Sequence, residues 1–110
     1  MLIRLSIENF LSFKDRTEFS MIPGMGRLKE HHKSTPVDGI QALKAGILYG
    51  ANASGKSNLV KAIRFAQKLI LHGTSNESDR IKQKPFRLDR ECLQKPSQIE
   101  FEFSHRGKNY

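Results

Sequence analysis

Residues 50–57 constrain the fold of this chain more than any other feature. The octapeptide reads Gly-Ala-Asn-Ala-Ser-Gly-Lys-Ser and fits the pattern G-x-x-x-x-G-K-S/T of a phosphate-binding loop, the P-loop. A short apolar run, residues 45–49, precedes the loop, and a helical pattern over residues 57–72 follows it. Because strand, loop and helix in this order are the context that the pattern requires, we predict a nucleotide phosphate site here.

The residue types of the loop match this chemistry. Gly50 and Gly55 permit backbone angles that direct successive N–H groups at one anion. The loop opens a helix, whose first N–H groups are unpaired and whose dipole is positive at that end. We expect Lys56 to end in solvent without a ligand and to reach the β- and γ-phosphates of a triphosphate, and Ser57 to hold Mg²⁺. None of these residues is a nucleophile, so hydrolysis needs further groups.

Length and composition limit the class of protein. A chain of 110 residues suits one small domain. No stretch reaches the roughly 20 apolar residues of a membrane span, and no basic-then-apolar signal segment opens the sequence. The single cysteine, Cys92, excludes an internal disulfide framework and fits a reducing compartment. We therefore predict a cytoplasmic protein with no membrane contact.

The charge balance is compatible with two kinds of surface. Nineteen Lys and Arg against eleven Asp and Glu give a net charge of +8, which favours polyanionic partners such as nucleic acid. Three basic residues recur at helical spacing, namely Lys61, Arg64 and Lys68. The simplest explanation is that they form the solvated face of an amphipathic helix. The basic segment 80–90 is diluted by acidic residues. Nucleic-acid contact and a plain solvated surface both stay open for this segment.

Hydrophobic periodicity predicts the elements around the loop. Alternation predicts a strand over residues 2–8, with Ile3, Leu5 and Ile7 on its buried face, and a second strand over residues 17–21, which together form an antiparallel hairpin. Composition predicts a loop insertion over residues 23–43. Residues 46–49 are short and apolar, as in a buried central strand. The predicted fold is α/β: an N-terminal hairpin, then a central strand, the P-loop and its helix.

Hydrophobic periodicity also predicts the packing face of the helix and a strand in the last third of the chain. The packing face of the helix is predicted to comprise Leu59, Ala62, Ile63, Ala66, Leu69 and Ile70, with Gly73 as the C-cap. Residues 99–103 alternate as a strand, followed by a turn over 105–108 and the start of a returning strand. No acidic residue after Ser57 ends an apolar run, as a P-loop ATPase needs for Mg²⁺. We therefore expect residues 1–110 to be the N-terminal portion of a longer P-loop ATPase domain, and we predict no catalytic residue within them.

Two groups of residues carry a family resemblance. The run Ile7-Glu8-Asn9-Phe10, the turn with Ser12-Phe13 and the stretch from residue 49 to 59 resemble the start of an ABC-type ATPase head of the branch that contains SMC, RecF and OLD proteins. The runs Pro-Phe-Arg-Leu-Asp at 85–89 and Pro-Ser-Gln-Ile-Glu-Phe at 96–101 resemble the AAA-type ATP-binding proteins of bacterial phage-defence, abortive-infection systems. This second resemblance is narrower and rests on fewer distinctive positions.

The resemblance implies a homodimer in which two heads sandwich two ATP molecules. It places the turn after Asn9 near the base and ribose. Leu11 stands where the branch often has a basic residue, so that Lys14 or Arg16 would substitute. Gln83 and Gln98 are candidates for the glutamine that senses Mg²⁺ and the γ-phosphate. The implied contacts to ATP and Mg²⁺ are made by Gly50, Asn52, Ala53, Ser54, Gly55, Lys56, Ser57 and Asn58.

Two functions stay open on this basis. In the first, the complete protein hydrolyses ATP and couples dimerisation to DNA transactions or to a phage-defence effector protein. In the second, the chain is a nucleotide-gated interaction module that binds ATP to assemble with an effector and does not itself turn over. A nucleotide or small-molecule kinase uses the same loop but more usually begins with the P-loop strand.

Overall fold

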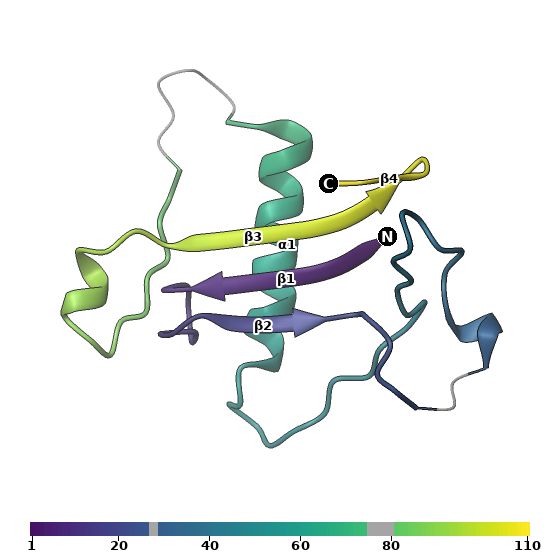
Figure 1. The fold of residues 1–110 in the computed structure, drawn as a ribbon. Helices are drawn as coiled ribbons and strands as arrows, with labels where there is room; N and C mark the ends of the chain where they lie inside the picture. The colour runs from purple at the N-terminus through teal and green to yellow at the C-terminus, as the bar shows by residue number, and fades with distance from the viewer. Residues whose placement is uncertain (27–28, 75–80) are drawn as a thin grey trace. The chain divides into compact units, whose positions relative to one another are not determined.

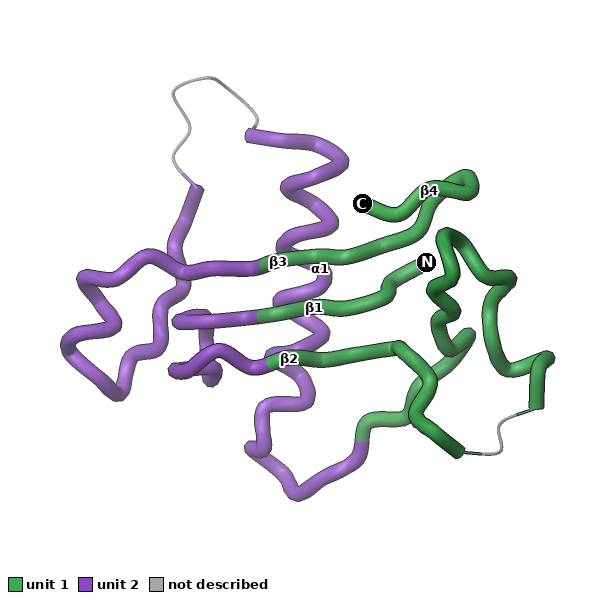
Figure 2. The backbone as a smooth tube through the Cα atoms, viewed as in Figure 1, with its two compact units in different colours: residues 1–6, 18–48, 100–110 green, residues 7–17, 49–99 purple. Residues whose placement is uncertain are grey.

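The structure is a computed structural model that describes residues 1–26, 29–74 and 81–110. The chain divides into two compact units, coloured separately in Figure 2. One unit comprises residues 1–6, 18–48 and 100–110, and the other comprises residues 7–17 and 49–99. The P-loop and its helix belong to the second unit, together with the turn that joins the first two strands.

A four-stranded sheet is built from β1 (Leu2–Glu8), β2 (Thr17–Ser20), β3 (Gln98–His105) and β4 (Lys108–Asn109). The strand order is β2-β1-β3-β4, and the arrows of Figure 1 show that neighbouring strands run antiparallel. The predicted N-terminal hairpin and the predicted strand over residues 99–103 are therefore confirmed. The start of a returning strand is confirmed as well, as β4.

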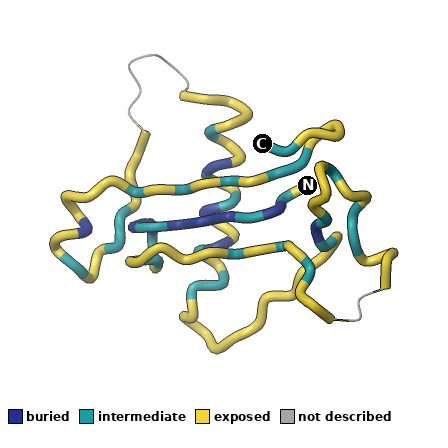
Figure 3. Tube along the Cα trace, viewed as in Figure 1, coloured by how far each residue is buried: buried dark blue, intermediate teal, exposed yellow. Residues whose placement is uncertain are grey.

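Strand β1, which lies between β2 and β3, carries several of the buried core side chains. Ile3, Leu5 and Ile7 are buried, as the alternation predicts (Figure 3). Ser6 is buried too, at 5% exposure, although alternation placed it on the solvent face. β1 has a strand on each side and therefore no open edge, whereas in an isolated hairpin it would be an edge strand.

The β3–β4 connection shows how local sequence fixes register. His105 pairs with Lys108, which leaves Arg106 and Gly107 as a two-residue loop. Both loop residues have positive φ, 50° and 74°. This combination is typical of the type I′ turn, whose twist matches that of the flanking strands. The predicted turn over residues 105–108 is confirmed.

The predicted central strand over residues 46–49 is wrong in this structure. These residues form no strand, and Ile47 and Tyr49 are 92% and 89% exposed. An extended segment becomes a strand only when another strand accepts its hydrogen bonds. The described strands pair with one another in the order β2-β1-β3-β4 and leave residues 46–49 unpaired. An apolar run alone cannot supply that partner.

Residues 23–43 contain short ordered pieces. A 3₁₀ helix, η1, spans Glu30–His32, and isolated bridges pair Lys33 with Leu43 and Val37 with Ile40. Residues 27–28 of this predicted insertion lie outside the described residues. Among the described helices, none is long and apolar enough to cross a membrane.

Candidate nucleotide site

The helix that follows the P-loop, α1 (Lys56–His72), begins and ends where the sequence predicts. Gly55 is its N-cap, in the left-handed conformation, and no side chain caps the first turn or places a carboxylate there. At the other end, the N–H of Gly73 donates to the carbonyl of Leu69 at 2.9 Å. The N-terminal end of α1 therefore keeps its positive dipole and lacks a side-chain cap, as an anion site requires.

The buried face of α1 is narrower than predicted. Leu59, Ala62 and Ala66 are buried. Ile70, which the periodicity placed on the packing face, is 61% exposed. An aromatic side chain that the prediction left out, Phe65, packs against Phe10 with ring centroids 5.3 Å apart. This contact joins α1 to the turn after β1, and sequence periodicity alone could not reveal it because the two rings are far apart in the chain.

The loop curls tightly upon itself. A Cβ on Gly50 would lie 3.1 Å from Oγ of Ser54, and the N–H of Ser54 donates to the carbonyl of Ala51 at 3.3 Å. Ala53 adopts a φ of 64°, which is a left-handed conformation. The sequence does not predict it, because residues other than glycine rarely have positive φ. Asn52, Ala53 and Ser54 are all exposed. The loop thus offers its backbone to solvent around a compact turn.

Lys56 lies against its own loop, and the expectation that its side chain ends in solvent is wrong. Its ammonium donates to the carbonyls of Gly50 and Ala51, at 2.7 and 2.5 Å, and to Oγ of Ser54 at 3.3 Å. The cause is that the curled loop turns two carbonyl oxygens toward the position that the lysine reaches. Phosphate oxygens would have to replace these carbonyls as partners of the ammonium.

Ser57 and Asn58 form the first turn of α1. Ser57 is exposed, so its hydroxyl is accessible to a cation. The N–H of Asn58 donates to the carbonyl of Gly55 at 2.9 Å, and Oδ1 of Asn58 accepts from Lys61 at 3.3 Å. An uncapped helix N-terminus, an ammonium over the loop and an accessible hydroxyl are together the donor set that a nucleotide phosphate with Mg²⁺ needs. The residues present fit that ligand.

The turn after β1 packs against the end of the P-loop. A Cβ on Gly55 would lie 3.1 Å from Oγ of Ser12 and 3.9 Å from Cζ of Phe13. Phe10 and Phe13 bridge to each other across the turn, with hydrogen bonds of 2.9 and 3.0 Å in the two directions. Ser12 and Phe13 are therefore immediate neighbours of the site's last glycine.

Gly55→Ala is expected to destabilise the protein by more than Gly107→Ala. Both positions have positive φ, 93° and 74°, which costs a residue with a Cβ about 1–2 kcal/mol. Only at position 55 does the new methyl group also meet Ser12, because nothing lies within 4 Å of the corresponding point on Gly107. Urea unfolding followed by circular dichroism measures the difference.

Removal of the Ser12 hydroxyl supplies the internal control for this comparison. In a Ser12→Ala background the excess cost of Gly55→Ala over Gly107→Ala should shrink, because Oγ is the atom that the methyl group approaches. Equal costs at the two glycines in the wild-type background would show that the turn does not press on the P-loop.

Asn9 holds a second segment against the same turn, and sequence reasoning missed it. Its Nδ2 donates to the carbonyls of Cys92 and Lys95 at 2.7 and 2.9 Å, with Pro96 further away at 3.3 Å. Its Oδ1 accepts from the N–H of Phe86 at 3.0 Å. Asn9 is only 3% exposed and has a φ of 48°, which asparagine tolerates better than most residues. The pattern of hydrophobic residues does not reveal this positive φ.

The residues predicted to contact the base or to sense Mg²⁺ lie near the surface or in an ion pair. Lys14 pairs with Asp89 at 2.7 Å. The hydrogen bond from Lys14 holds the pKa of the Asp89 carboxyl below its ordinary value, helped by the N–H of Glu91, and the same hydrogen bond raises the pKa of Lys14. Arg16 is exposed, as are the two glutamines, Gln83 before η2 (Glu91–Leu93) and Gln98 at the start of β3. Their roles stay predictions.

Comparison with known proteins gives one match. A family model described as "AAA domain, putative AbiEii toxin, Type IV TA system" matches residues 47–110. The matched region begins just before the P-loop and includes α1, β3 and β4, and it covers more than half of the chain. No curated protein and no solved structure shows significant similarity to the chain.

Proposed function

Because this chain belongs to the AAA-domain family described as a putative AbiEii toxin of a Type IV TA system, we propose that residues 50–58 bind ATP together with Mg²⁺. Membership in an AAA family carries a nucleotide-binding function of the ATPase type. The observation that carries the site assignment is the position of Lys56. Its ammonium lies over the curled loop, at the N-terminal end of a helix without a side-chain cap.

Each part of the loop has a separate task in this proposal. The first N–H groups of α1 and the ammonium of Lys56 bind phosphate oxygens. Ser57 offers its hydroxyl to Mg²⁺, whose charge offsets that of the β- and γ-phosphates when it is bound. Gly50 keeps the loop tight, since a side chain there would meet Ser54. The turn at Ser12 and Phe13 supports Gly55 from the other side.

Calorimetric titration with ATP and Mg²⁺, beside AMP and Mg²⁺, tests the proposal. We expect saturable ATP binding and AMP binding that is weaker by roughly 100-fold, because AMP lacks the phosphates that Lys56 reaches and each charge-assisted hydrogen bond contributes about 1.5–3 kcal/mol. AMP and ATP binding with equal affinity would place the nucleotide site away from the P-loop.

We further propose that the complete protein is an SMC/RecF-like head that works in the cytoplasm as a homodimer with ATP between the subunits, and that it acts in DNA transactions or with a defence effector. The exposure of Tyr49 and of residues 51–54 supports this, because it leaves the outer side of the loop open to a second chain. Sedimentation of the full-length protein with and without a non-hydrolysable ATP analogue tests it. A monomer under both conditions would contradict the sandwich.

Phosphate release by the full-length protein separates the two functions that the sequence leaves open. A hydrolysing head releases phosphate at a steady rate. A nucleotide-gated module binds the analogue and ATP alike, assembles with its effector and releases none.

A further inference from the structure

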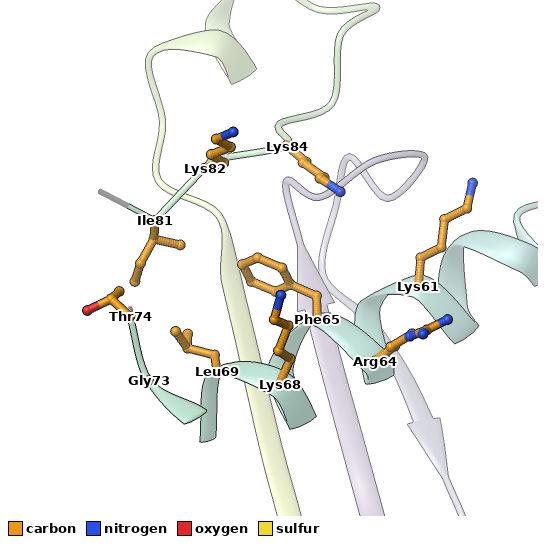
Figure 4. Close-up of a pocket in the computed structure, with 10 residues that line it drawn as sticks. All are labelled: Lys61, Arg64, Phe65, Lys68, Leu69, Gly73, Thr74, Ile81, Lys82 and Lys84. Atoms are coloured by element: carbon orange, nitrogen blue, oxygen red, sulfur yellow. The ribbon is translucent and has the colours of Figure 1, made fainter. Parts of the chain in front are cut away.

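A groove in the second unit runs between α1 and residues 81–84, with a volume of about 840 Å³ (Figure 4). It shares no lining residue with the P-loop. Two segments supply its cations: one row lies on α1 and the other on the extended piece after residue 80. The N–H of Leu11 donates to the carbonyl of Lys84 at 2.8 Å and so anchors the end of that piece. The five cations are Lys61, Arg64, Lys68, Lys82 and Lys84.

These cations are not neutralised within the part of the chain that the structure describes. No carboxylate is among the lining residues, and none of the five cations forms an ion pair with a described Asp or Glu. Other basic residues of the chain are paired, for example Lys14 with Asp89 and Lys95 with Glu91. Five positive charges that no described carboxylate pairs repel each other around one groove, so an anionic ligand is favoured there.

The floor of the groove is apolar. Figure 4 shows the side chains of Phe65, Leu69 and Ile81 directed toward the space between the two segments. Phe65 is fixed in place by its contact with Phe10. Ile81 is 50% exposed, although isoleucine is usually buried. A small inorganic anion would use the cations but not this floor.

We propose that this groove binds a single strand of nucleic acid. The phosphodiester groups lie along the two rows of cations, and unpaired bases lie against Phe65 and its apolar neighbours, the combination by which proteins hold single strands. A duplex keeps its bases stacked inside and would contact only the cations. The site is independent of the nucleotide site, because it needs neither Lys56 nor any other residue of the loop.

Fluorescence anisotropy with a labelled 20-nucleotide oligothymidylate, without ATP, tests the proposal on the full chain. The triple variant Lys68→Gln, Lys82→Gln and Lys84→Gln should bind at least roughly 10-fold more weakly, because each lost phosphate contact removes a released counterion. All three side chains are exposed, so the fold should persist. The matched control, Lys44→Gln, Lys95→Gln and Lys108→Gln, removes the same charge outside the groove and should bind within about twofold of wild type.

Further measurements distinguish binding in the groove from a general effect of the protein's positive charge. With five phosphate contacts, the logarithm of the affinity should fall with the logarithm of the salt concentration with a slope of about −3.5. Replacement of the same three lysines by arginine should retain binding, and Lys56→Ala should leave it unchanged while ATP binding is lost. Equal weakening in both glutamine triples, absence of binding by wild type, or a duplex bound as tightly as the single strand would each overturn the proposal.

Discussion

Lys56→Ala is expected to weaken ATP binding by roughly 100-fold or more, while the free energy of unfolding changes by less than about 1 kcal/mol. The ammonium is the one cationic side chain of the loop, and it would exchange its contacts to Gly50 and Ala51 for phosphate oxygens. A methyl group cannot make those contacts. The two carbonyls that lose the ammonium lie in exposed residues, so water can replace it as their partner.

Titration calorimetry and urea unfolding of the same preparations measure both parts of this prediction. Lys108→Ala serves as the matched control, because it removes an exposed lysine in β4, far along the chain from the P-loop. Lys56→Arg keeps the charge but replaces a compact ammonium by a broad planar group, so it should restore only part of the affinity. A folded Lys56→Ala variant that binds ATP within about threefold of wild type would contradict the assignment of Lys56 to phosphate.

The sequence predicts those parts of the fold that depend on nearby residues. The P-loop pattern and the helix after it are local, and α1 begins at Lys56 and ends before Gly73 as expected. The β3–β4 hairpin is also local, because Arg106 and Gly107 determine its turn. In each case the deciding interactions join residues that lie close together in the chain.

The parts that the sequence does not predict depend on residues far apart in the chain. Residues 46–49 look like a buried strand, but a strand needs partners, and their pairing cannot be read from their composition. The helix face is misjudged at Phe65 for the same reason, because its partner Phe10 lies far away in the chain. Ile70, which the periodicity placed on the packing face, is exposed. The groove combines cations from two segments that the sequence treats as separate charged patches.

The most informative role that the sequence does not predict is that of Asn9. Its side chain replaces hydrogen bonds that secondary structure would otherwise supply. Residues 84–97 form no strand with the turn after β1, apart from one hydrogen bond between Leu11 and Lys84. The side chain of Asn9 therefore satisfies several of their backbone groups, and Oγ of Ser97 donates to the carbonyl of Asn9 at 2.5 Å. A single side chain thus connects the turn beside the P-loop to a segment more than 70 residues away.

Asn9→Ala is accordingly expected to lower the free energy of unfolding by about 3 kcal/mol or more. The substitution removes one acceptor and a two-hydrogen donor at a site that is 3% exposed, and it leaves the carbonyl of Cys92 buried without that partner. Alanine also tolerates the φ of 48° less well than asparagine does. Circular dichroism at 222 nm during urea unfolding reports the loss, since α1 supplies most of the helical signal.

Two further variants show whether the cost arises from the geometry at Asn9. Asn109→Ala makes the same chemical change at a position where Nδ2 donates to the carbonyl of Val37 at 3.0 Å, and it should cost only about 1 kcal/mol. Asn9→Asp should be worse than Asn9→Ala, because a carboxylate oxygen would then face the carbonyl oxygens of Cys92 and Lys95 in place of an amide donor. If Asn9→Asp were tolerated, the carbonyls of Cys92 and Lys95 would not depend on the amide donor, and Asn9 would not hold the 84–97 segment through its nitrogen. If Asn9→Ala cost no more than Asn109→Ala, the segment would be held by its own packing, and the support of the P-loop through Ser12 and Phe13 would not depend on Asn9.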